Sequence, residues 1–360
     1  MHNPADPELT PARAPFGELF TPHMVTARWQ QGEDWSRPHL APFADLPMSP
    51  AMVGLHYGQV VFEGLKGYRR PGGGVDLFRP LDHAARLRRS AERLAMPVLP
   101  DTLFQDAVEL LVSADQASLP QAPGLSLYLR PLLFADEANL ALRPARSYTF
   151  LLIAFVTGGF FSDRPDPVTV FVSRDYTRAA PGGTGGVKFA GNYAPAYLAQ
   201  EQAVSAGCHQ VVWLDPVERR WVEELGGMNL FFVRGHGADA ELVTPPAVGT
   251  LLPGITRDSL MTLAGRQGIA VREEPIAVDQ WRQESLDGTL TETFAAGTAA
   301  VVTPVGTVRD GDQEWRIGDG TAGPVTLALR DALVDVHTGR AAAPAGWLHR
   351  VAPALAPVTA

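Results

Sequence analysis

The part of the sequence that most constrains the fold reads GGTGGVKFAGNY and covers residues 182–193. It follows a predicted strand at 168–173 and precedes a predicted helix from about 193 to 206, which Gly207 closes. Strand and helix patterns mix on both sides of it without a strict strand–helix–strand rhythm. The sequence therefore predicts an α+β fold rather than a doubly wound parallel sheet.

The length and one linker-like segment indicate two domains. The chain has 360 residues, whereas one domain usually takes roughly 150. Residues 158–167, GGFFSDRPDP, place glycines and prolines between two apolar strands, as is typical of an interdomain linker. We therefore expect a first domain at 1–157, whose first dozen residues form a flexible arm, and a second domain at 168–360.

Composition narrows the class of protein. Hydrophobic residues make up 46% of the chain, which is enough for sizeable cores and excludes disorder as the main state. The net charge of −9 argues against a broad surface for nucleic acid or for anionic membranes. Charged residues reach 19%, below the usual share of roughly 25%, so we expect association to cover part of the surface.

Targeting and metal signals are weak throughout. The N-terminal segment lacks a basic start followed by an apolar stretch, and no apolar run is long enough to cross a bilayer. The single cysteine, Cys208, permits no intrachain disulfide and no cysteine zinc cluster. None of the nine histidines has a metal-binding spacing, so we expect no metal. These features predict a cytoplasmic protein without a membrane partner.

The glycine-rich loop contains one candidate reactive group, Lys188. The loop is not a P-loop, because the residue directly before Lys188 is Val187 and not a glycine, and because Phe189 stands where that motif has a hydroxyl residue. A solvated loop lysine is the ordinary interpretation. The alternative is a lysine in an apolar niche, where its amine becomes a nucleophile toward a carbonyl, most usefully that of pyridoxal phosphate.

That cofactor also needs a carboxylate for its ring nitrogen and an anion pocket for its phosphate. Glu224 lies just before a Gly-Gly turn, and LPGITR at 252–257 opens a helix whose first amides form an anion site. The small residues AAGTAA at 295–300 allow a ligand close to the backbone. Each feature also fits an ordinary role, as a solvated acid or a tight turn, and Arg86 fits either a phosphate site or a solvated basic helix face.

In this order, the segments closely resemble the branched-chain amino acid aminotransferases, which are fold type IV pyridoxal-phosphate enzymes of the class IV aminotransferase family. The resemblance runs from about Pro42 to His337. It is carried by LHYGQVVFEGLK at 55–66, LFRP at 77–80, LYLRP at 127–131, VKFAGNY at 187–193, ELGGMN at 224–229, LPGITR at 252–257 and GTA at 297–299. It implies a homodimer of two-domain α+β subunits, with a small N-terminal α/β domain, a larger C-terminal mixed-sheet domain and the cofactor at their interface.

The resemblance also implies roles for single residues. Lys188 would form the Schiff base and later move the substrate proton, Tyr193 would donate to the ring oxygen, and Glu224 would keep the ring nitrogen protonated. The phosphate would be bound by Arg86, the amides of Ile255 and Thr256, and the Thr298 hydroxyl. Substrate contacts would come from Tyr57, Phe62, Tyr128, Arg130, Phe160, Gly297, Thr298 and Ala299, with Arg130 available for the distal carboxylate of glutamate.

The sequence departs from the family pattern in three ways. Phe160 replaces a usual tyrosine, Gly227 replaces a threonine found in many members, and Ala300 and Thr303 replace a cysteine pair of some members. The implied activity is reversible ping-pong transfer of an amino group between L-leucine, L-isoleucine or L-valine and 2-oxoglutarate. Two alternatives remain: a D-amino-acid aminotransferase or aminodeoxychorismate lyase that uses the same lysine, and a non-catalytic phosphate-ligand-binding protein of the same fold.

Overall fold

The computed structural model describes residues 16–158 and 165–352, and the chain divides into two compact units. The first unit comprises Met1–Phe161 together with Val336–Ala360, and the second comprises Ser162–Asp335. The sequence-based boundaries differ at the C-terminus, since they assign 336–360 to the second domain. The difference arises because Leu348–Val351 pairs with a strand of the first unit, a long-range contact that local sequence does not encode. The expected flexible arm at the N-terminus lies outside the described residues.

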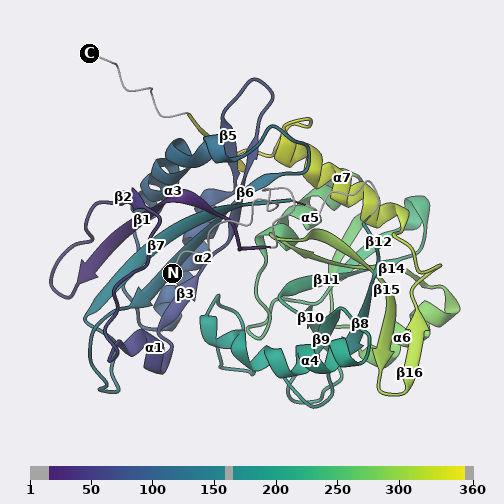
Figure 1. Cartoon of the computed structure of the whole chain (residues 1–360). Coiled ribbons are helices and arrows are strands. Elements are labelled where there is room, and N and C mark those ends of the chain that lie inside the picture. The colour runs from purple at the N-terminus through teal and green to yellow at the C-terminus, as the bar shows by residue number, and fades with distance from the viewer. Residues whose placement is uncertain (1–15, 159–164, 353–360) are drawn as a thin grey trace. The chain divides into compact units, whose positions relative to one another are not determined.

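The first unit is built on an antiparallel sheet in the order β17-β5-β4-β6-β7-β1-β2, with β3 also paired to β6 (Figure 1). Its strands are β1 (Phe20–Gln30), β2 (His39–Pro42), β3 (Val60–Phe62), β4 (Leu65–Arg69), β5 (Val75–Phe78), β6 (Ser126–Ala135), β7 (Ser147–Thr157) and β17 (Leu348–Val351). Its helices are α1 (Val53–Tyr57), α2 (Pro80–Arg93) and α3 (Asp101–Asp115). The sequence predicts a helix that starts at Asp101 and strands at 126–134 and 148–156, and α3, β6 and β7 confirm all three.

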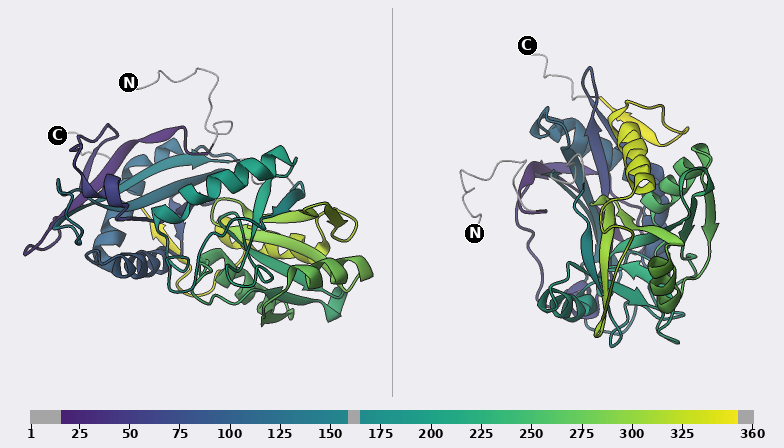
Figure 2. Two further views of the ribbon diagram at one scale, coloured as in Figure 1. Left: turned by 90° about the horizontal axis from the view of Figure 1, so that it is seen from below. Right: turned by 90° about the vertical axis from the view of Figure 1, so that its right-hand side faces the viewer.

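Helices α2 and α3 lie on one face of the first sheet (Figure 2). Apolar side chains recur along both helices with helical spacing, among them Leu87, Phe104 and Leu111, and these pack with inward-facing strand residues such as Leu129 and Phe150. This shared core fixes the direction of β4 and β6. Strand β6 carries Tyr128 and Arg130, two residues with predicted binding roles, and β4 pairs with β6 at Tyr128.

The second unit contains a mixed sheet in the order β10-β9-β8-β15-β14-β11-β12-β13, with β16 paired to β15 and β10 also paired to β11. Its strands are β8 (Val168–Val172), β9 (Gln210–Leu214), β10 (Val222–Leu225), β11 (Met228–Arg234), β12 (Glu241–Thr244), β13 (Ala270–Glu273), β14 (Leu290–Gly297), β15 (Val301–Asp310) and β16 (Gln313–Arg316). Its helices are α4 (Tyr197–Ser205), α5 (Ile255–Arg266), α6 (Val278–Asp287) and α7 (Pro324–Thr338), the last of which ends in the first unit.

The second sheet combines parallel and antiparallel pairs, which confirms the α+β prediction. Strand β8 is parallel to β9 and β15, whereas β10, β11, β14 and β15 form antiparallel pairs. Helix α4 buries Ala199 and Ala203 against Trp213 of β9, and Trp281 of α6 packs into the core on Trp315 of β16. None of the helices in the described ranges is both long and apolar enough to cross a membrane.

Two helix starts differ from the sequence-based prediction. The sequence predicts a helix at 257–266 with Thr256 as its cap, whereas α5 begins at Ile255 with Gly254 in the N-cap position, so Thr256 lies inside the first turn. The residues from Ala190 to Ala196 form two short 3₁₀ helices, and the α-helix proper starts only at Tyr197. Pro195 contributes to this delay because its ring fixes φ and removes a donor. Tyr193 is therefore held on a 3₁₀ turn beside the glycine-rich loop.

Candidate active site

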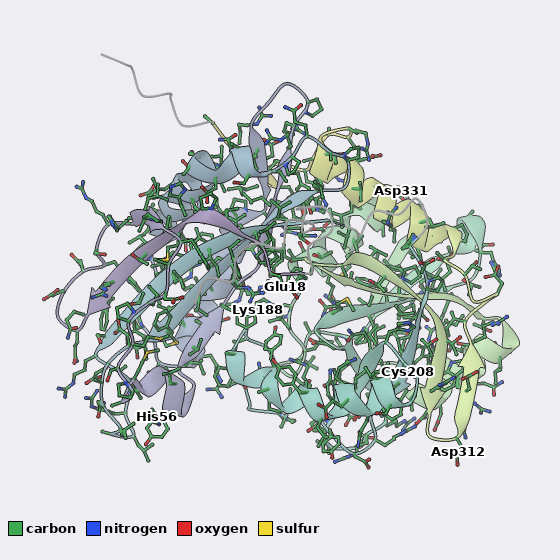
Figure 3. All side chains as sticks on the ribbon, viewed as in Figure 1. Glu18, His56, Lys188, Cys208, Asp312 and Asp331 are labelled. Carbon is green, nitrogen blue, oxygen red and sulfur yellow. The ribbon has the colours of Figure 1, made fainter. Side chains whose placement is uncertain are left out.

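Lys188 and Tyr193 lie together at the end of the glycine-rich loop. The Nζ of Lys188 donates a hydrogen bond of 3.2 Å to the hydroxyl oxygen of Tyr193, and Figure 3 marks the lysine in the second unit. The 3₁₀ turn at Ala190–Asn192 separates the two residues, so their side chains reach the same side of the loop. The structure thus brings together the predicted nucleophile and the predicted ring-oxygen donor.

Close backbone packing sets the shape of the loop. A Cβ on Gly185 would stand 2.3 Å from the carbonyl oxygen of Thr250, a distance that no side chain could tolerate without movement. Asn192 is buried beneath the loop and donates to the carbonyls of Thr184 (2.8 Å) and Val187 (3.1 Å). The loop that ends in Lys188 is therefore held by specific contacts on both sides.

Glu224 is a buried carboxylate at the end of β10, with 2% of its surface exposed. The amide of Leu252 donates to its Oε1 at 2.7 Å, and the Nε of Arg178 lies 3.1 Å from its Oε2. Burial raises the pKa of Glu224, and Arg178 and the Leu252 amide offset part of that rise. A carboxylate in this setting can hold a protonated ring nitrogen.

The sheet brings two turns and one helix start to the same edge. Asn229 of β11 lies opposite Glu224 of β10 and Ala296 of β14, so the turns after β10 and β14 are neighbours. Asn229 donates to the carbonyl of Leu252 at 3.0 Å, and a Cβ on Gly254 would lie 2.0 Å from the Asn229 Oδ1. The start of α5 is therefore seated on the same edge.

A cavity of about 160 Å³ opens at this edge. Its lining includes Arg178, Asn192, Tyr193, Trp213, Glu224, Gly226, Gly227 and Leu252. Gly227, one of the departures from the family pattern, would place a Cβ 3.8 Å from the Tyr193 ring, so the position has room for a side chain. Lys188 and the first residues of α5 do not line this cavity, so it covers the part of the edge between Tyr193 and Glu224 and not the whole candidate site.

The start of α5 has the geometry of an anion site. The first-turn amides of a helix, that of Thr256 among them, have no acceptor within the helix, and they point along its axis together with the positive end of the helix dipole. Ile255 and Thr256 are both buried there. Thr298, Gly297 and Ala299 occupy or adjoin the β14–β15 turn at the same end of the sheet. This places five of the predicted binding residues at one sheet edge.

Arg86 of α2 is buried in the first unit and bound to a carboxylate that the sequence did not single out. Its Nε and Nη2 donate to Glu63 at 2.7 and 2.9 Å, and His83 Nδ1 lies 2.7 Å from the same carboxylate. Burial alone would raise the pKa of Glu63, but Arg86 and His83 hold it well below its usual range. One edge of the Arg86 guanidinium is thus occupied by Glu63.

Three predicted substrate residues form a cluster in the first unit. The Arg130 guanidinium lies over the rings of Phe62 (4.9 Å) and Tyr128 (5.6 Å), and its Nη2 approaches the Tyr128 hydroxyl at 3.5 Å. Gly64 makes this possible, since a Cβ there would lie 1.9 Å from the Tyr128 hydroxyl. Tyr57 does not join the cluster by any such contact. It is half exposed on α1 and donates to the carbonyl of Leu140.

Some predicted or overlooked residues need separate mention. Phe160 lies outside the described residues. Cys208 is buried beside α4, away from Lys188 (Figure 3). Sequence reasoning missed Arg178 and Thr250, because nothing in their local patterns separates them from ordinary polar residues. It also missed Asn192, Asn229 and Glu63, which could have been noticed because all three lie inside motifs already quoted.

Comparison with known proteins agrees with this geometry. The family model described as amino-transferase class IV matches residues 60–308. A branched-chain-amino-acid aminotransferase of Mycobacterium tuberculosis is 50% identical over 337 residues, which are 93% of this chain and 92% of that protein. A probable branched-chain-amino-acid aminotransferase of Streptomyces coelicolor is 49% identical over 94% of this chain and 92% of its own length.

Solved structures give the same result. The branched-chain amino acid aminotransferase of Escherichia coli superposes with a TM-score of 0.74 at 30% identity, over 91% of this chain and 100% of that chain. The T.th. branched-chain amino acid aminotransferase, complexed with N-(5'-phosphopyridoxyl)-L-glutamate, has a TM-score of 0.73 at 29% identity, over 91% and 99% of the two chains. On the strength of the family model and of relatives half identical over almost their whole length, this chain belongs to the class IV aminotransferase family.

Proposed function

We propose that the protein is a pyridoxal-phosphate-dependent branched-chain amino acid aminotransferase. It transfers an amino group reversibly, in a ping-pong cycle, between L-leucine, L-isoleucine or L-valine and 2-oxoglutarate. The observation that carries the proposal is the single sheet edge where Lys188, Tyr193 and Glu224 meet the start of α5. The names of relatives that are 49–50% identical over more than nine tenths of the chain support the choice of substrate.

The residues of this edge fit pyridoxal phosphate. The buried Glu224 suits the ring nitrogen, and the Tyr193 hydroxyl suits the ring oxygen. The amides of Ile255 and Thr256 and the Thr298 hydroxyl suit the phosphate. The resemblance assigns Arg86 to the phosphate as well, and Arg86 belongs to the first unit, where it is bound to Glu63. When bound, the cofactor supplies an electron sink for the carbanion that forms as the substrate α-proton is lost.

The chain's own groups perform the remaining steps. The Lys188 Nζ would hold the cofactor as a Schiff base. Once the substrate amine has taken its place, the freed Nζ would accept the substrate α-proton in one half-reaction and would deliver a proton to the corresponding carbon of the keto acid in the reverse half-reaction. The hydrogen bond from Lys188 to Tyr193 orients the amine. Glu224 keeps a proton on the ring nitrogen, and the turn at Gly297, Thr298 and Ala299 presents amides to the substrate α-carboxylate.

The substrate side chain must meet both apolar and charged partners, because leucine and glutamate bind in turn. Phe62 and Tyr128 provide apolar and aromatic surface, and Arg130 lies beside them to bind the distal carboxylate of glutamate. The resemblance assigns Tyr57 to substrate contact as well, although in the structure its hydroxyl donates to the carbonyl of Leu140. The apolar surface would bind the leucine side chain and Arg130 the glutamate side chain, so one site would accept two chemically different side chains.

The working form is a cytoplasmic homodimer. Four large apolar side chains on or near α1 stay exposed in the single subunit: Leu55, Tyr57, Leu140 and Leu142. Exposed apolar residues gathered in this way are typical of a surface that another protein covers. The low share of charged residues, 19%, agrees with a covered surface.

An amino-donor panel tests the activity. The purified protein is mixed with pyridoxal phosphate and 2-oxoglutarate, and glutamate formation is measured with L-leucine, L-isoleucine, L-valine and D-alanine. We expect turnover with the three branched-chain donors and little with D-alanine. Turnover with D-alanine, or pyruvate release from aminodeoxychorismate, would instead assign one of the sibling activities. A protein that binds the cofactor and turns over none of these substrates would contradict the proposal.

A further inference from the structure

Arg178 is a buried arginine that none of the predicted roles includes. It lies in the loop after β8, and 8% of its side chain is exposed. Its Nη2 donates to the carbonyls of Gly185 (3.2 Å) and Thr250, which ties the glycine-rich loop to the segment that precedes α5. Removing a guanidinium from water costs free energy, so a buried arginine usually has a charged partner.

That partner is Glu224. The Nε of Arg178 lies 3.1 Å from the Glu224 Oε2, but the direction is not that of an aligned hydrogen bond, so the contact is an ion pair. The other oxygen of the carboxylate accepts the Leu252 amide at 2.7 Å. The two contacts have different effects. The Leu252 amide orients the Glu224 carboxylate, and the Arg178 guanidinium supplies the opposite charge.

A second buried carboxylate, Glu223, competes for the same cation. Thr250 donates its hydroxyl to the Glu223 Oε1, and within the described residues the Oε2 of Glu223 has no hydrogen-bond partner. Burial raises the pKa of Glu223, and the Thr250 hydroxyl and, to a smaller degree, Arg178 offset part of the rise. A carboxyl group with one unsatisfied buried oxygen costs less as a neutral acid than as an anion. Within the described residues Arg178 forms an ion pair with Glu224 and none with Glu223.

The ring nitrogen of the cofactor needs Glu224 as an anion. Burial works against that form, since it raises the pKa of Glu224 more than any other influence, and Arg178 is the largest influence in the opposite direction. Without the guanidinium, Glu224 would tend to keep its own proton and would no longer hold one on the ring nitrogen.

We propose that Arg178 is the positioning residue for Glu224: its buried guanidinium, 3.1 Å from the carboxylate, supplies the opposite charge that keeps Glu224 an anion for the pyridine nitrogen. The inference rests on the proposed use of pyridoxal phosphate. It concerns a residue that touches neither the cofactor nor the substrate in the proposed mechanism, and it acts only through Glu224.

An analogue without the ring nitrogen separates this role from simple bracing of the loop. The dissociation constants of pyridoxal phosphate and of 1-deazapyridoxal phosphate, in which a C–H group replaces the nitrogen, are measured on the apoprotein by fluorescence titration. The variants are Arg178→Met, Arg178→Lys and Arg174→Met. Arg174 is the matched control, because it is an exposed arginine of the same loop that pairs with Asp310.

We expect the wild type and Arg174→Met to bind pyridoxal phosphate more tightly than the analogue. In Arg178→Met, affinity for pyridoxal phosphate falls by roughly tenfold or more, the equivalent of one pKa unit, and affinity for the analogue falls much less. The preference between the ligands therefore collapses. Arg178→Lys keeps the positive charge but loses the hydrogen bonds from Nη2 to the carbonyls of Gly185 and Thr250. We expect this variant to retain most of the preference for pyridoxal phosphate.

Equal losses for both ligands in Arg178→Met would overturn the inference and leave Arg178 as a loop brace. Thermal unfolding of the apoproteins shows whether each variant is folded. If Arg178→Met does not fold, Arg178→Lys decides alone, since loss of the preference despite the retained charge also contradicts the inference. Failure of the proposed function is distinguishable, because the wild type itself would then fail to bind pyridoxal phosphate or to transfer amino groups.

Discussion

Lys188 and Lys66 are the two lysines of the chain. We expect Lys188→Ala to lose covalent attachment of the cofactor and keep its fold, because a primary amine is required at that position and the side chain is not part of a core. The measurement is mass spectrometry of peptides after borohydride reduction. The wild type should carry the adduct on the Lys188 peptide, and Lys66→Met should behave like the wild type. An adduct on Lys66 in the Lys188→Ala protein would contradict the assignment.

Arg130 tests the assignment of the substrate pocket. Within the described residues no carboxylate forms an ion pair with Arg130, and its guanidinium lies over Phe62 and Tyr128. Its charge is thus available to glutamate and is of no use to leucine. Arg130→Met should lower kcat/KM for glutamate by tens-fold, equivalent to about 2 kcal/mol, and leave leucine much less affected.

Single-turnover rates with each amino acid, read from the absorbance of the bound cofactor, make the comparison. Arg88→Met provides the control, because Arg88 is a half-exposed arginine paired with Asp101 on the surface of α2 and α3. Equal losses for glutamate and leucine in Arg130→Met would mean that Arg130 does not discriminate between the substrates.

Lys66 predicts a pH dependence of stability. Burial lowers the pKa of Lys66 to about 7, whereas the unfolded chain has the usual value of about 10.5. Between these values the unfolded state binds more protons, so the folded state gains stability as the pH rises. His337, stacked on Tyr68 nearby, has a pKa well below its usual value and stays neutral over this range.

Urea unfolding of the wild type and Lys66→Met at pH 7 and pH 9.5 measures the effect. Relative to the variant, the wild type should gain up to about 1.4 kcal/mol per pH unit. A difference between the two proteins that does not change with pH would show that Lys66 keeps its proton in the folded state.

At the scale of elements, the loop that carries Lys188 depends on its contact with the segment before α5. Gly185→Ala should displace the loop, because the added Cβ would stand 2.3 Å from the Thr250 carbonyl oxygen and 2.5 Å from the Ala179 Cβ. We expect lower affinity for pyridoxal phosphate and a loss of stability of about 1–3 kcal/mol.

Gly265→Ala supplies the matched control. Gly265 lies in α5, and its added Cβ would meet nothing within 4 Å. A glycine-to-alanine change in such a helix position should raise stability by about 0.5–1 kcal/mol. Cofactor titration and chemical unfolding of both variants are the measurements. A Gly185→Ala protein that binds the cofactor like the wild type would show that the loop moves without cost.

At the scale of the whole molecule, the exposed apolar residues near α1 predict where the subunits of the proposed homodimer meet. Leu142 has 88% of its surface exposed in the single subunit. Leu142→Asp should weaken the dimer, because a buried aspartate without a partner is costly. The control is Val217→Asp, at a position that is 76% exposed on the turn between β9 and β10. Sedimentation velocity over a dilution series gives the dissociation constants, and an unchanged dimer in Leu142→Asp would place the interface elsewhere.

Much of the molecule follows from local sequence. The periodicity of 101–115 and the branched and aromatic residues of 126–135 and 147–157 specify α3, β6 and β7 closely, because these segments bury one face against a common core. The motifs around Lys188, Tyr193, Glu224 and 252–257 were also readable, since a glycine-rich loop, a strand-end acid and a helix start each have a local signature.

Only the tertiary structure decided which distant residues form ion pairs and which strands pair at the edge of a sheet. Arg178 meets Glu224, Arg86 meets Glu63, and Leu348–Val351 adds a strand to the first sheet. None of these pairings produces a pattern in the local sequence, because each joins residues that lie 23 or more positions apart. Each pairing depends instead on which buried charge or strand edge lacks a partner. Local sequence determined the elements and the reactive groups, and long-range packing decided which neighbours control the charge of those groups.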